Sequence, residues 1–324
     1  MNGPADHIPV LVDEVVGAVV LREGGIFLDG TVGLGGTSAA ILDAAGPDAK
    51  LLGVDLDPTC VALAGRRLAR FGDRALVLCG DFAHLGFLAG SHGRLPADGI
   101  VLDLGLSSWL LEASGRGFSF QRDEPLDMRF DPDGERRAED VLNLESLQSL
   151  TKMLREFGQE PLAARIARAI VARRERSPLV TTGDLRELVV EMMPRGRVEK
   201  TLARVFQTFR IFVNRELDKL RSALPEMVEM LRPGGRLAVI GYHSLEHRVV
   251  KDVFRRLSGQ CICPPDLPVC GCHPIRKLRV VEGAVRPGEV EVARNPRARS
   301  AVLRVVERVP DGEEESWDVR ARGV

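Results

Sequence analysis

Between Gly25 and Leu106, short apolar runs alternate with stretches of helical pattern. The runs read GIFLDGT, KLLGVDLD, ALVLCGDF and GIVLDLGL, and helices are expected from Thr37 and over residues 58–70. Such alternation is typical of a parallel α/β sheet. Nearly continuous apolar strands are what burial on both faces requires. The pattern therefore predicts an α/β fold with a parallel sheet for this part of the chain.

After Ser108 the pattern changes to a loop rich in Gly, Arg and Asp, and then to mostly helical sequence from about Ala138 to about Ser222. Within EPLAARIARAIVARRERSP, apolar residues recur at i, i+4 and i+8, and basic residues share another face. The apolar positions are Leu162, Ile166 and Ile170, and the basic ones are Arg165, Arg168 and Arg176. We interpret residues 109–222 as an inserted helical domain with one packed side and one basic side.

The α/β pattern then resumes towards the end of the chain. The sequence predicts a helix from about Glu216, a turn at RPGG (residues 232–235), a strand over RLAVIGYHS, a helix from about Leu245 and a late strand at residues 300–309. Residues 1–108 and 223–309 are thus expected to form one domain in two parts. A polar tail is expected over residues 310–324.

The composition is that of an ordinary globular chain, with 44% hydrophobic and 28% charged residues. The formal net charge of −1 hides an asymmetry, because residues 151–222 hold 16 Lys and Arg residues against nine Asp and Glu residues. That segment could face phosphates. No apolar run approaches the roughly 18 residues of a membrane span, and no signal-peptide pattern opens the chain. We expect a cytoplasmic protein that does not enter a membrane.

The segment DGTVGLGGTSAAIL places glycines, including Gly35 and Gly36, between a strand and a helix. Glycines there allow close backbone approach and direct the N-terminal amides of the helix at a ligand. Dinucleotide enzymes use similar loops, so the glycines alone do not identify the ligand. Asp29 directly precedes the loop, and its charge disfavours a pyrophosphate but suits the ammonium and sulfonium groups of S-adenosylmethionine. This charge favours a methyl donor.

Acidic residues stand at the ends of four successive predicted strands, namely Asp29, Asp55, Asp81 and Asp103. Ligands bind at the carboxyl ends of the strands in such sheets. Asp55 stands where a carboxylate can accept hydrogen bonds from both ribose hydroxyls, a feature that NAD enzymes share. Phe82 could lie against an adenine ring with Asp81 near its exocyclic amine, or be an ordinary core aromatic.

The six cysteines comprise two isolated residues and a cluster of four within CICPPDLPVCGCH. Four thiols and His273 would suffice for a tetrahedral zinc site. The C-x-C spacing and the prolines are not typical of such a site, and a surface loop with reduced thiols is the alternative. We predict no metal in the active site. The clustered residues are Cys261, Cys263, Cys270 and Cys272.

Longer motifs are more specific than the glycine loop. In chain order they read DGTVGLGGTS, VDLDP, GDF, DGIVLDLGLSS, RGFSFQRDEPLDMRFDP, VFQTFRIFVNREL, RPGGRLAVIGYHSLEHRVVK and NPRARSAVLR. From about His7 to about Glu307 they closely resemble the bacterial 16S rRNA (cytosine-N4)-methyltransferases, the MraW family. The resemblance implies a Rossmann-like class I methyltransferase sheet with an inserted α-helical domain. It also implies transfer of a methyl group from S-adenosyl-L-methionine to N4 of a cytidine in the decoding region of 16S (small-subunit) ribosomal RNA.

The resemblance also implies positions that bind the cofactor. Carried over by position, they are Gly35, Gly36 and Thr37 in the loop, Asp55 on the ribose, Phe82 by the adenine and Asp103 in the same pocket. The chain departs from the family pattern at three places. Thr37 replaces the usual histidine, Leu110 stands where a glutamine is usual, and His247 replaces an acid. The second departure removes a side-chain hydrogen bond to the cofactor, and the third puts any charge role of that position in doubt.

The N4 amine of cytosine is a poor nucleophile because its lone pair is delocalised into the ring. We predict that Asp103 hydrogen-bonds this amine and localises the lone pair, although Asp103 could serve the cofactor alone. His243 is the second catalytic candidate, since imidazole can accept a proton near neutral pH, and a structural role is its alternative. Ser107 and Ser108 could orient the base or make an ordinary cap.

The implied partner is 16S rRNA or the small ribosomal subunit, with the RNA backbone along the basic helical insertion. The target base must be splayed out to reach the pocket. Two other classes of protein stay open at this point. One is a nicotinamide-dependent dehydrogenase with the same sheet, which cofactor titration would separate. The other is a ribosome-assembly factor without turnover, which Leu110 makes conceivable and which incubation of small subunits with a labelled methyl donor would separate.

Overall fold

The computed structural model describes residues 9–261, 263 and 276–310. The chain divides into two compact units, each with its own core. Of the described residues, those before Leu106 and those from Leu217 onwards form the sheet unit, and Leu106–Glu216 form the helical unit. Among the described residues, no helix combines the length and the apolar character that crossing a membrane would require.

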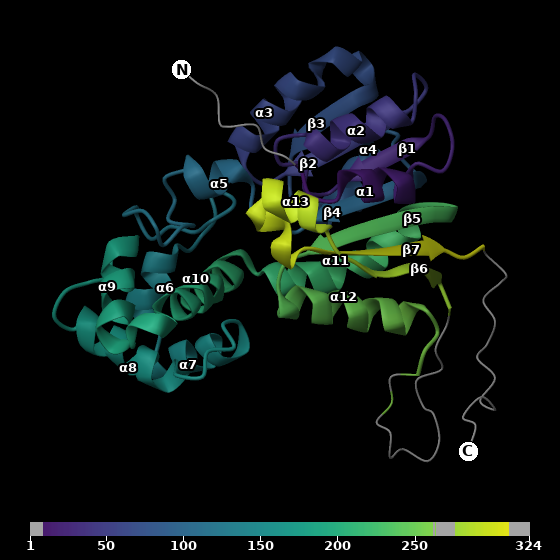
Figure 1. The fold of residues 1–324 in the computed structure, drawn as a ribbon. Helices are drawn as coiled ribbons and strands as arrows, with labels where there is room; N and C mark the ends of the chain where they lie inside the picture. The colour runs from purple at the N-terminus through teal and green to yellow at the C-terminus, as the bar shows by residue number, and fades with distance from the viewer. Residues whose placement is uncertain (1–8, 262, 264–275, 311–324) are drawn as a thin grey trace. The chain divides into compact units, whose positions relative to one another are not determined.

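A seven-stranded sheet with the order β3-β2-β1-β4-β5-β7-β6 forms the centre of the sheet unit (Figure 1). The first five strands in this order run parallel, and β7 runs antiparallel to both of its neighbours. Because β1 pairs with both β2 and β4, the strand order reverses beside it. Such a reversal point is where open α/β sheets bind ligands. The strands are β1 (Ile26–Asp29), β2 (Lys50–Asp55), β3 (Ala75–Cys79), β4 (Ala97–Asp103), β5 (Leu231–Gly241), β6 (Leu278–Val285) and β7 (Val302–Arg308).

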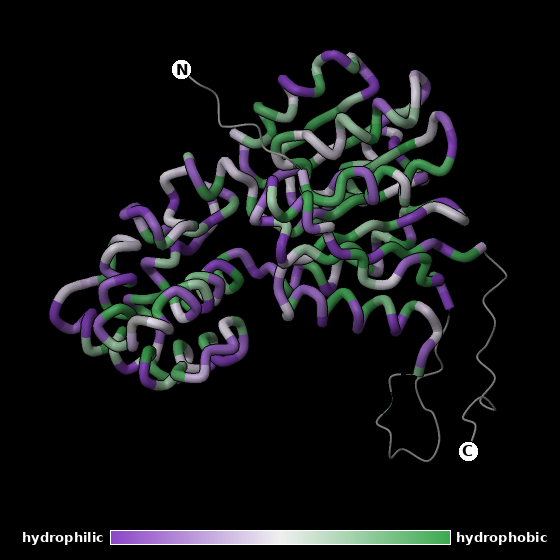
Figure 2. Tube along the Cα trace, viewed as in Figure 1, coloured by the Kyte–Doolittle hydropathy of each residue, from purple (hydrophilic) through white to green (hydrophobic). Residues whose placement is uncertain are grey.

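Helices cover both faces of this sheet (Figure 1). One face carries α1 (Val12–Val19), α2 (Gly36–Ala44) and α3 (Pro58–Leu68), and the other carries α11 (Glu216–Met230) and α12 (Ser244–Leu257). The helix α4 (Leu85–Ser91) contacts the end of α11, where a Cβ on Gly86 would meet Met230. Figure 2 shows that the strands are mostly hydrophobic, as burial between two helical layers requires. Shorter elements complete the unit: η1 (Ala69–Arg74), η2 (Phe82–His84), α13 (Glu289–Arg294) and η4 (Pro296–Ser300).

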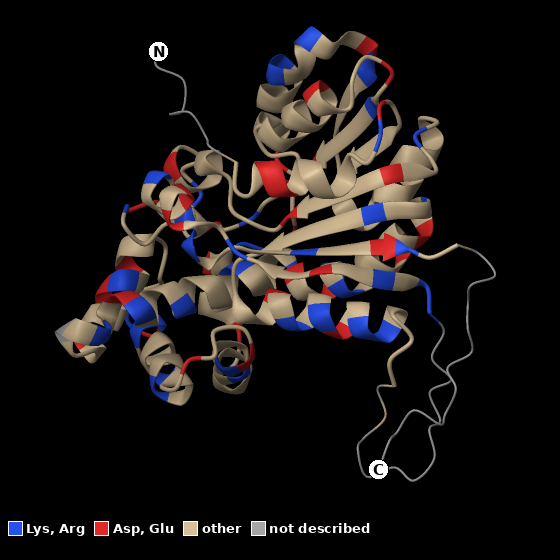
Figure 3. Cartoon of the chain, turned by 45° about the vertical axis from the view of Figure 1, so that its right-hand side comes forward, with Lys and Arg blue, Asp and Glu red and all other residues tan. Residues whose placement is uncertain are grey.

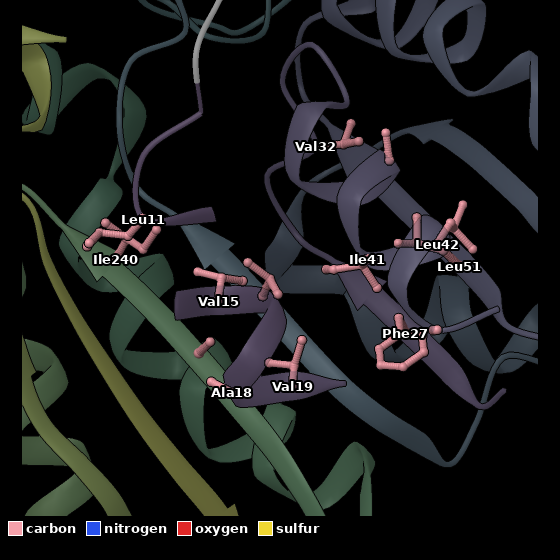
Figure 4. Close-up of a cluster of buried hydrophobic side chains, with 14 of the residues drawn as sticks. Leu11, Val15, Ala18, Val19, Phe27, Val32, Ile41, Leu42, Leu51 and Ile240 are labelled. Atoms are coloured by element: carbon pink, nitrogen blue, oxygen red, sulfur yellow. The ribbon is translucent and has the colours of Figure 1, made fainter. Parts of the chain in front are cut away.

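The core between the first helical layer and the sheet is built from side chains distant in sequence. Figure 4 shows Val15 and Val19 of α1 between Ile240 of β5 on one side and Ile41 of α2 and Phe27 of β1 on the other. All five side chains are at most 1% exposed. This packing holds α2 against β1, and the glycine loop connects these two elements.

The helical unit packs its helices around a separate core. The packed side of α8 contributes Ile166 and Ile170, both fully buried, as the apolar periodicity predicts. Phe209 of α10 is buried in the same core. The elements are α5 (Ser108–Glu112), α6 (Ala138–Leu144), α7 (Leu147–Glu156), α8 (Ala163–Arg174), α9 (Thr182–Met192), η3 (Arg195–Arg197) and α10 (Val198–Asn214).

The observed boundaries differ from the sequence-based ones at both ends of the helical unit. Its residues run from 106 to 216 rather than from 109 to 222. The second boundary comes earlier than expected because α10 ends before Arg215, which adopts a left-handed conformation (φ +52°). The following helix, α11, packs with the sheet from Leu217 onwards. A left-handed residue just past a helix is a common terminator, but arginine gives no sequence signal for it. The expected polar tail lies almost entirely outside the described residues.

Four helices or strands of the sheet unit were not predicted from the sequence: α1, α4, β6 and α13. β6 is amphipathic and largely exposed, and its pairing with β7 shifts register twice. Its sequence, LRVVEGAV, therefore lacks the apolar run that identified the other strands. The RPGG segment forms an irregularity within β5 instead of a free turn, because the register with β4 jumps between Leu231 and Arg236.

Candidate active site

Three acids lie at the ends of neighbouring strands on the carboxyl edge of the sheet. Asp29 ends β1, Asp55 ends β2 and Asp103 ends β4, and β1 lies between the other two strands. The structure therefore brings together three of the four acids that the sequence marked. The fourth, Asp81, follows β3 by two residues and caps the short helix η2.

Asp29 is buried at the base of the glycine loop, with only 2% of its surface exposed. Its Oδ2 accepts a hydrogen bond from Ser38 Oγ at 2.6 Å, and its Oδ1 accepts one from the Thr31 amide at 3.1 Å. Burial raises the pKa of Asp29 to about 6, and the nearby acids add to the shift. Among the groups that set this pKa no cation is present, so a bound cation would stabilise the ionised form.

Thr31 connects the first acid to the third. Its hydroxyl accepts a hydrogen bond from the Asp103 amide at 2.6 Å, while its own amide donates to Asp29. The side chain thus ties the end of β4 to the start of the glycine loop. A movement of the loop would be transmitted to the backbone that positions Asp103.

The half-buried carboxyl group of Asp103 is held by two donors. Tyr242 donates its hydroxyl, and the Gly105 amide donates to Oδ1 at 3.1 Å. Burial raises the pKa of Asp103 to about 6 despite these bonds, and the charge of Glu246 adds to the rise. Burial likewise raises the pKa of Tyr242, so its phenol stays protonated and remains a donor.

Gly105 makes room for this arrangement. A Cβ at that position would lie 2.8 Å from the Tyr242 ring and 3.1 Å from Asp103 Oδ1, closer than side-chain carbons normally come. Any larger residue would displace the ring from the carboxylate. The glycine of the LGLSS motif is therefore needed for the Tyr242–Asp103 contact.

Asp55 organises the glycine loop through backbone amides. Its Oδ2 accepts from Gly33 and its Oδ1 accepts from Asp57, both at 2.9 Å. Gly35 precedes α2 with a left-handed backbone (φ +76°), and within the described residues no side chain caps this helix. The first amides of α2, which include those of Gly36 and Thr37, can therefore serve a ligand.

Phe82 lies next to the glycine loop, and Asp81 directly precedes it as the N-cap of η2. A Cβ on Gly30 would come within 3.1 Å of the Phe82 Cβ, which shows how closely Phe82 covers the loop. Asp81 accepts from the Ala83 amide at 2.9 Å and pairs with Lys219 Nζ at 2.7 Å. The ion pair with Lys219 of α11 was not foreseen, because no pattern links residues so far apart in sequence.

His243 is the N-cap of α12. Its Nδ1 accepts from the Glu246 amide at 3.3 Å, and Glu246 accepts in return from the His243 amide at 3.1 Å and the Tyr242 amide at 2.7 Å. Such a reciprocal pair is a capping box. Nε2 lies 3.1 Å from Glu246 Oε1, but the angle does not make a hydrogen bond. The catalytic role of His243 stays a prediction, with its Nδ1 engaged in the cap.

Sequence reasoning missed several residues of this site. Thr31, Ser38, Tyr242 and Glu246 all hold or surround the acids. A signal existed for two of them. Tyr242 is the only tyrosine of the chain and directly precedes His243, and Glu246 follows His243 at the three-residue spacing of a capping box. Thr31 and Ser38 gave no such signal, because small polar residues are common in loops.

Other predicted residues fall outside the sheet unit or outside the described residues. Ser107 caps α5 by accepting from the Leu110 amide at 3.2 Å, and the Leu110 side chain is buried in the core of the helical unit. The Leu110 amide is thus already used within the helix. Cys261 and Cys263 are half-buried, whereas Cys270, Cys272 and His273 lie outside the described residues.

The chain is similar to proteins of a known family. Residues 4–309 match the MraW methylase family. A ribosomal RNA small subunit methyltransferase H from Syntrophotalea carbinolica is 46% identical over 94% of this chain and 98% of its own length. One from Thermomicrobium roseum is also 46% identical, over 94% of each chain. A solved rRNA methylase from Streptococcus thermophilus aligns over 92% of this chain and 94% of its own, with a TM-score of 0.40 and 11% identity.

The residues at the sheet edge fit the cofactor that such an enzyme uses. Uncapped amides at the start of α2 suit a carboxylate, and the buried Asp29 suits a cationic group. The predicted α/β methyltransferase fold and methyl donor are thus confirmed. The family match spans most of the chain and the relatives align over nearly their full length. The chain therefore belongs to the MraW methylase family and is an S-adenosylmethionine-dependent methyltransferase.

Proposed function

We propose that this enzyme methylates N4 of a cytidine in the decoding region of 16S rRNA, in the free RNA or in the small ribosomal subunit. The relatives named as small-subunit rRNA methyltransferases support the RNA substrate. The observation that carries the choice of an amine is the Asp103 carboxyl group at the end of β4, held by Tyr242 and Gly105. A carboxylate so placed is an acceptor for an N–H donor.

The cofactor-binding residues follow from the geometry of the loop. The amides of Gly35, Gly36 and Thr37 would hold its carboxylate or neighbouring polar groups, Asp55 its ribose hydroxyls and Phe82 its adenine. Asp29 would hold cationic charge at the base of the loop. Bound there, S-adenosylmethionine supplies an electrophilic methyl group on a positively charged sulfur.

Asp103 has two tasks in the proposed reaction. Its carboxylate accepts a hydrogen bond from the N4 amine, which localises the nitrogen lone pair and aligns it for attack. Methyl transfer would break the bond between the methyl group and sulfur, leave S-adenosylhomocysteine, and give a positively charged nitrogen. Asp103 would then accept the proton that this nitrogen releases. A pKa of about 6 matches both tasks near neutral pH, because the group is ionised beforehand and still basic enough to take a proton.

Tyr242 and His243 act around Asp103 in this proposal. Tyr242 keeps the carboxylate oriented and ionised by donating its hydroxyl. His243, as the cap of α12, fixes the backbone that carries Tyr242, because both amides bind Glu246. We therefore assign the proton to Asp103 and a positioning role to His243.

The basic face of the helical unit is the proposed surface for the RNA backbone. Arg165, Arg168 and Arg176 are all exposed in or just after α8. Lys and Arg segments recur along the helices of this unit in Figure 3. Each phosphate contact with single-stranded RNA should contribute about −0.7 to the salt dependence of binding. Replacing the three arginines together should flatten that dependence, whereas an unchanged slope would exclude this face.

Mass spectrometry of rRNA nucleosides tests the function directly. Cells lacking the gene should lose one N4-methylated cytidine from 16S rRNA, and the wild-type gene should restore it. A gene carrying Asp103→Asn should not restore it. Loss of a methyl group from a different base, or no loss at all, would overturn the proposed substrate. Small subunits from the deletion strain, incubated with labelled methyl donor, show whether assembled particles are accepted.

A further inference from the structure

The antiparallel end of the sheet holds cationic side chains that the proposed methyl transfer does not use. Arg304 lies near the start of β7, in register with Val239 of β5. Arg286 directly follows β6, whose last residue, Val285, pairs with Leu303. The pairing of the strands therefore brings the two arginines to the same edge of the sheet, where β5 also ends at Gly241.

Arg304 has an unusual environment for a cation. Its Nε is buried and has no hydrogen-bond partner among the described residues. Burial lowers the pKa of Arg304, and the like charge of Arg286 lowers it further. Arg304 is half-buried as a whole, and leaving its buried Nε without a hydrogen-bond acceptor costs free energy that an anion could offset. An anionic hydrogen-bond acceptor at this edge would therefore stabilise Arg304.

His247 of α12 lies against the same edge. A Cβ on Gly241 would come within 3.1 Å of His247 Nδ1, so the ring packs on the end of β5. Its pKa is lowered, first by burial and also by Arg304 and Arg286, although Glu246 opposes the shift. The neutral imidazole does not neutralise the arginines. Two acids of this edge already accept backbone amides, Glu246 from Tyr242 and Glu291 from Leu11.

Exposed arginines extend this surface. Arg297 and Arg299 belong to η4, which ends just before β7 begins at Val302. Val302 pairs with Gly241, and Tyr242 follows Gly241 directly, so the surface adjoins the residues that hold Asp103. We call Arg286, Arg304, Arg297 and Arg299, with His247 beside them, the cationic edge.

We propose that the cationic edge binds backbone phosphates of the RNA strand next to the nucleotide that enters the active site. The inference rests on the proposed function for its substrate. It adds a second phosphate-binding surface, on the sheet unit, to the one expected on the helical unit. Phosphate oxygens would accept from the guanidinium groups and satisfy the buried Nε of Arg304.

Position 247 offers a matched pair of variants. His247→Asp places a carboxylate beside the arginines, and His247→Asn has the same shape without the charge. The probe is a fluorescein-labelled single-stranded RNA of the decoding-region sequence, bound in the presence of S-adenosylhomocysteine. We expect His247→Asp to weaken RNA binding about tenfold more than His247→Asn, with equal thermal stability and equal affinity for S-adenosylhomocysteine. Equal RNA affinities of the two variants would overturn the proposal.

A second pair of variants tests the exposed arginines. Arg297→Gln with Arg299→Gln should lower the slope of log affinity against log salt by about 1.4, at about 0.7 per contact. The control, Arg255→Gln with Arg256→Gln, removes the same charge from exposed positions at the far end of α12 and should leave the slope unchanged. Equal slopes for the two double variants would overturn the proposal.

The proposed function is tested separately. If the wild-type enzyme binds the RNA but transfers no methyl group to small subunits, the proposed function fails while the cationic edge is still supported by the binding data. If the enzyme methylates the subunits and the variant pairs do not differ, the function stands and the cationic edge fails.

Discussion

The pKa values of carboxyl groups are shifted in opposite directions in the two units, upwards for Asp29 and Asp103 and downwards for Asp127. In the sheet unit, Asp29 and Asp103 are set among other acids and polar donors, and burial raises both pKa values to about 6. In the helical unit, Asp127 binds the Arg129 guanidinium through both oxygens, at 2.6 and 2.8 Å, and its pKa is lowered. The first arrangement costs stability and the second contributes to it.

This difference separates functional from structural acids. A protein keeps buried acids without cations where a ligand or a reaction uses them. Asp127 and Arg129 belong to the PLDMRF motif, among the most specific of the sequence, yet their contacts lie within the loop and at the start of α6. Arg129 also donates to the Gly134 carbonyl, and Asn214 of α10 donates to the Met128 carbonyl. The motif thus maintains a loop conformation, while the proposed reacting group, Asp103, lies elsewhere, at the end of β4.

The largest expected effect is on Asp103. Asp103→Asn keeps the shape of the side chain but removes the proton acceptor, so single-turnover methyl transfer to small subunits should fall about 10²- to 10⁴-fold. Affinity for S-adenosylhomocysteine, measured by calorimetry, should change far less. As a control, Asp43→Asn removes an exposed carboxylate paired with Arg70 and should leave the rate unchanged. A rate within threefold of wild type for Asp103→Asn would limit Asp103 to binding the cofactor.

The next effect concerns stability at Asp29. The folded state holds the proton of Asp29 more tightly than the unfolded chain, whose ordinary pKa is about 3.9. This favourable contribution is complete below that pKa and is lost as pH rises through about 6. Asp29→Asn cannot ionise, so at pH 8 it should be more stable than wild type by about 3 kcal/mol, the free-energy equivalent of about two pKa units.

Thermal unfolding of the cofactor-free protein checks this prediction. The melting temperature of Asp29→Asn should exceed that of wild type at pH 8, and the excess should shrink as pH falls to 5. The same variant should bind S-adenosylmethionine more weakly, since the counter-charge is gone. A variant less stable than wild type at pH 8 would mean that the ionised Asp29 stabilises the fold.

The fold was more accessible from sequence than the site. Strands such as KLLGVDLD can be recognised in the sequence because burial on both faces requires a continuous apolar run. Each of these strands is followed or ended by its acid at the predicted edge of the sheet. β6 was missed because an exposed strand needs no apolar pattern. Thr31 and Tyr242 were missed because their contacts with Asp103 depend on strand order, which brings residues 72 and 139 positions away to the end of β4.

Asp127 should show the opposite sign to Asp29. Its lowered pKa means that the ionised form stabilises the fold at every pH above the unfolded value, and that this contribution is lost only as pH falls below about 3.9 towards the folded pKa. Asp127→Asn should therefore destabilise the protein by about 2 kcal/mol, as expected for losing charged hydrogen bonds to Arg129. The deficit should be the same at pH 8 and pH 5.

The two asparagine variants are each other's control in melting experiments. Asp29→Asn should be more stable than wild type by an amount that depends on pH, and Asp127→Asn should be less stable by an amount that does not change between pH 5 and pH 8. If Asp127→Asn became equal to wild type at pH 5, the Arg129 pair would not be holding the carboxylate ionised there. The pKa values of Asp29 and Asp127 would then differ in size of shift rather than in direction.

The smallest effect is expected at Tyr242. Tyr242→Phe removes a hydrogen bond that lowers the pKa of Asp103, so the pH at which the single-turnover rate is half-maximal should rise by up to about one unit above 6. The rate at pH 8 should change little, because Asp103 is ionised there in both proteins. A structural role alone would lower the rate at all pH values without moving the profile.

Because Tyr242 is the only tyrosine, ultraviolet difference spectra report its phenol directly. In the folded wild type it should resist ionisation beyond the ordinary pKa of about 10. Asp103→Asn, which removes the adjacent negative charge, should make it easier to ionise.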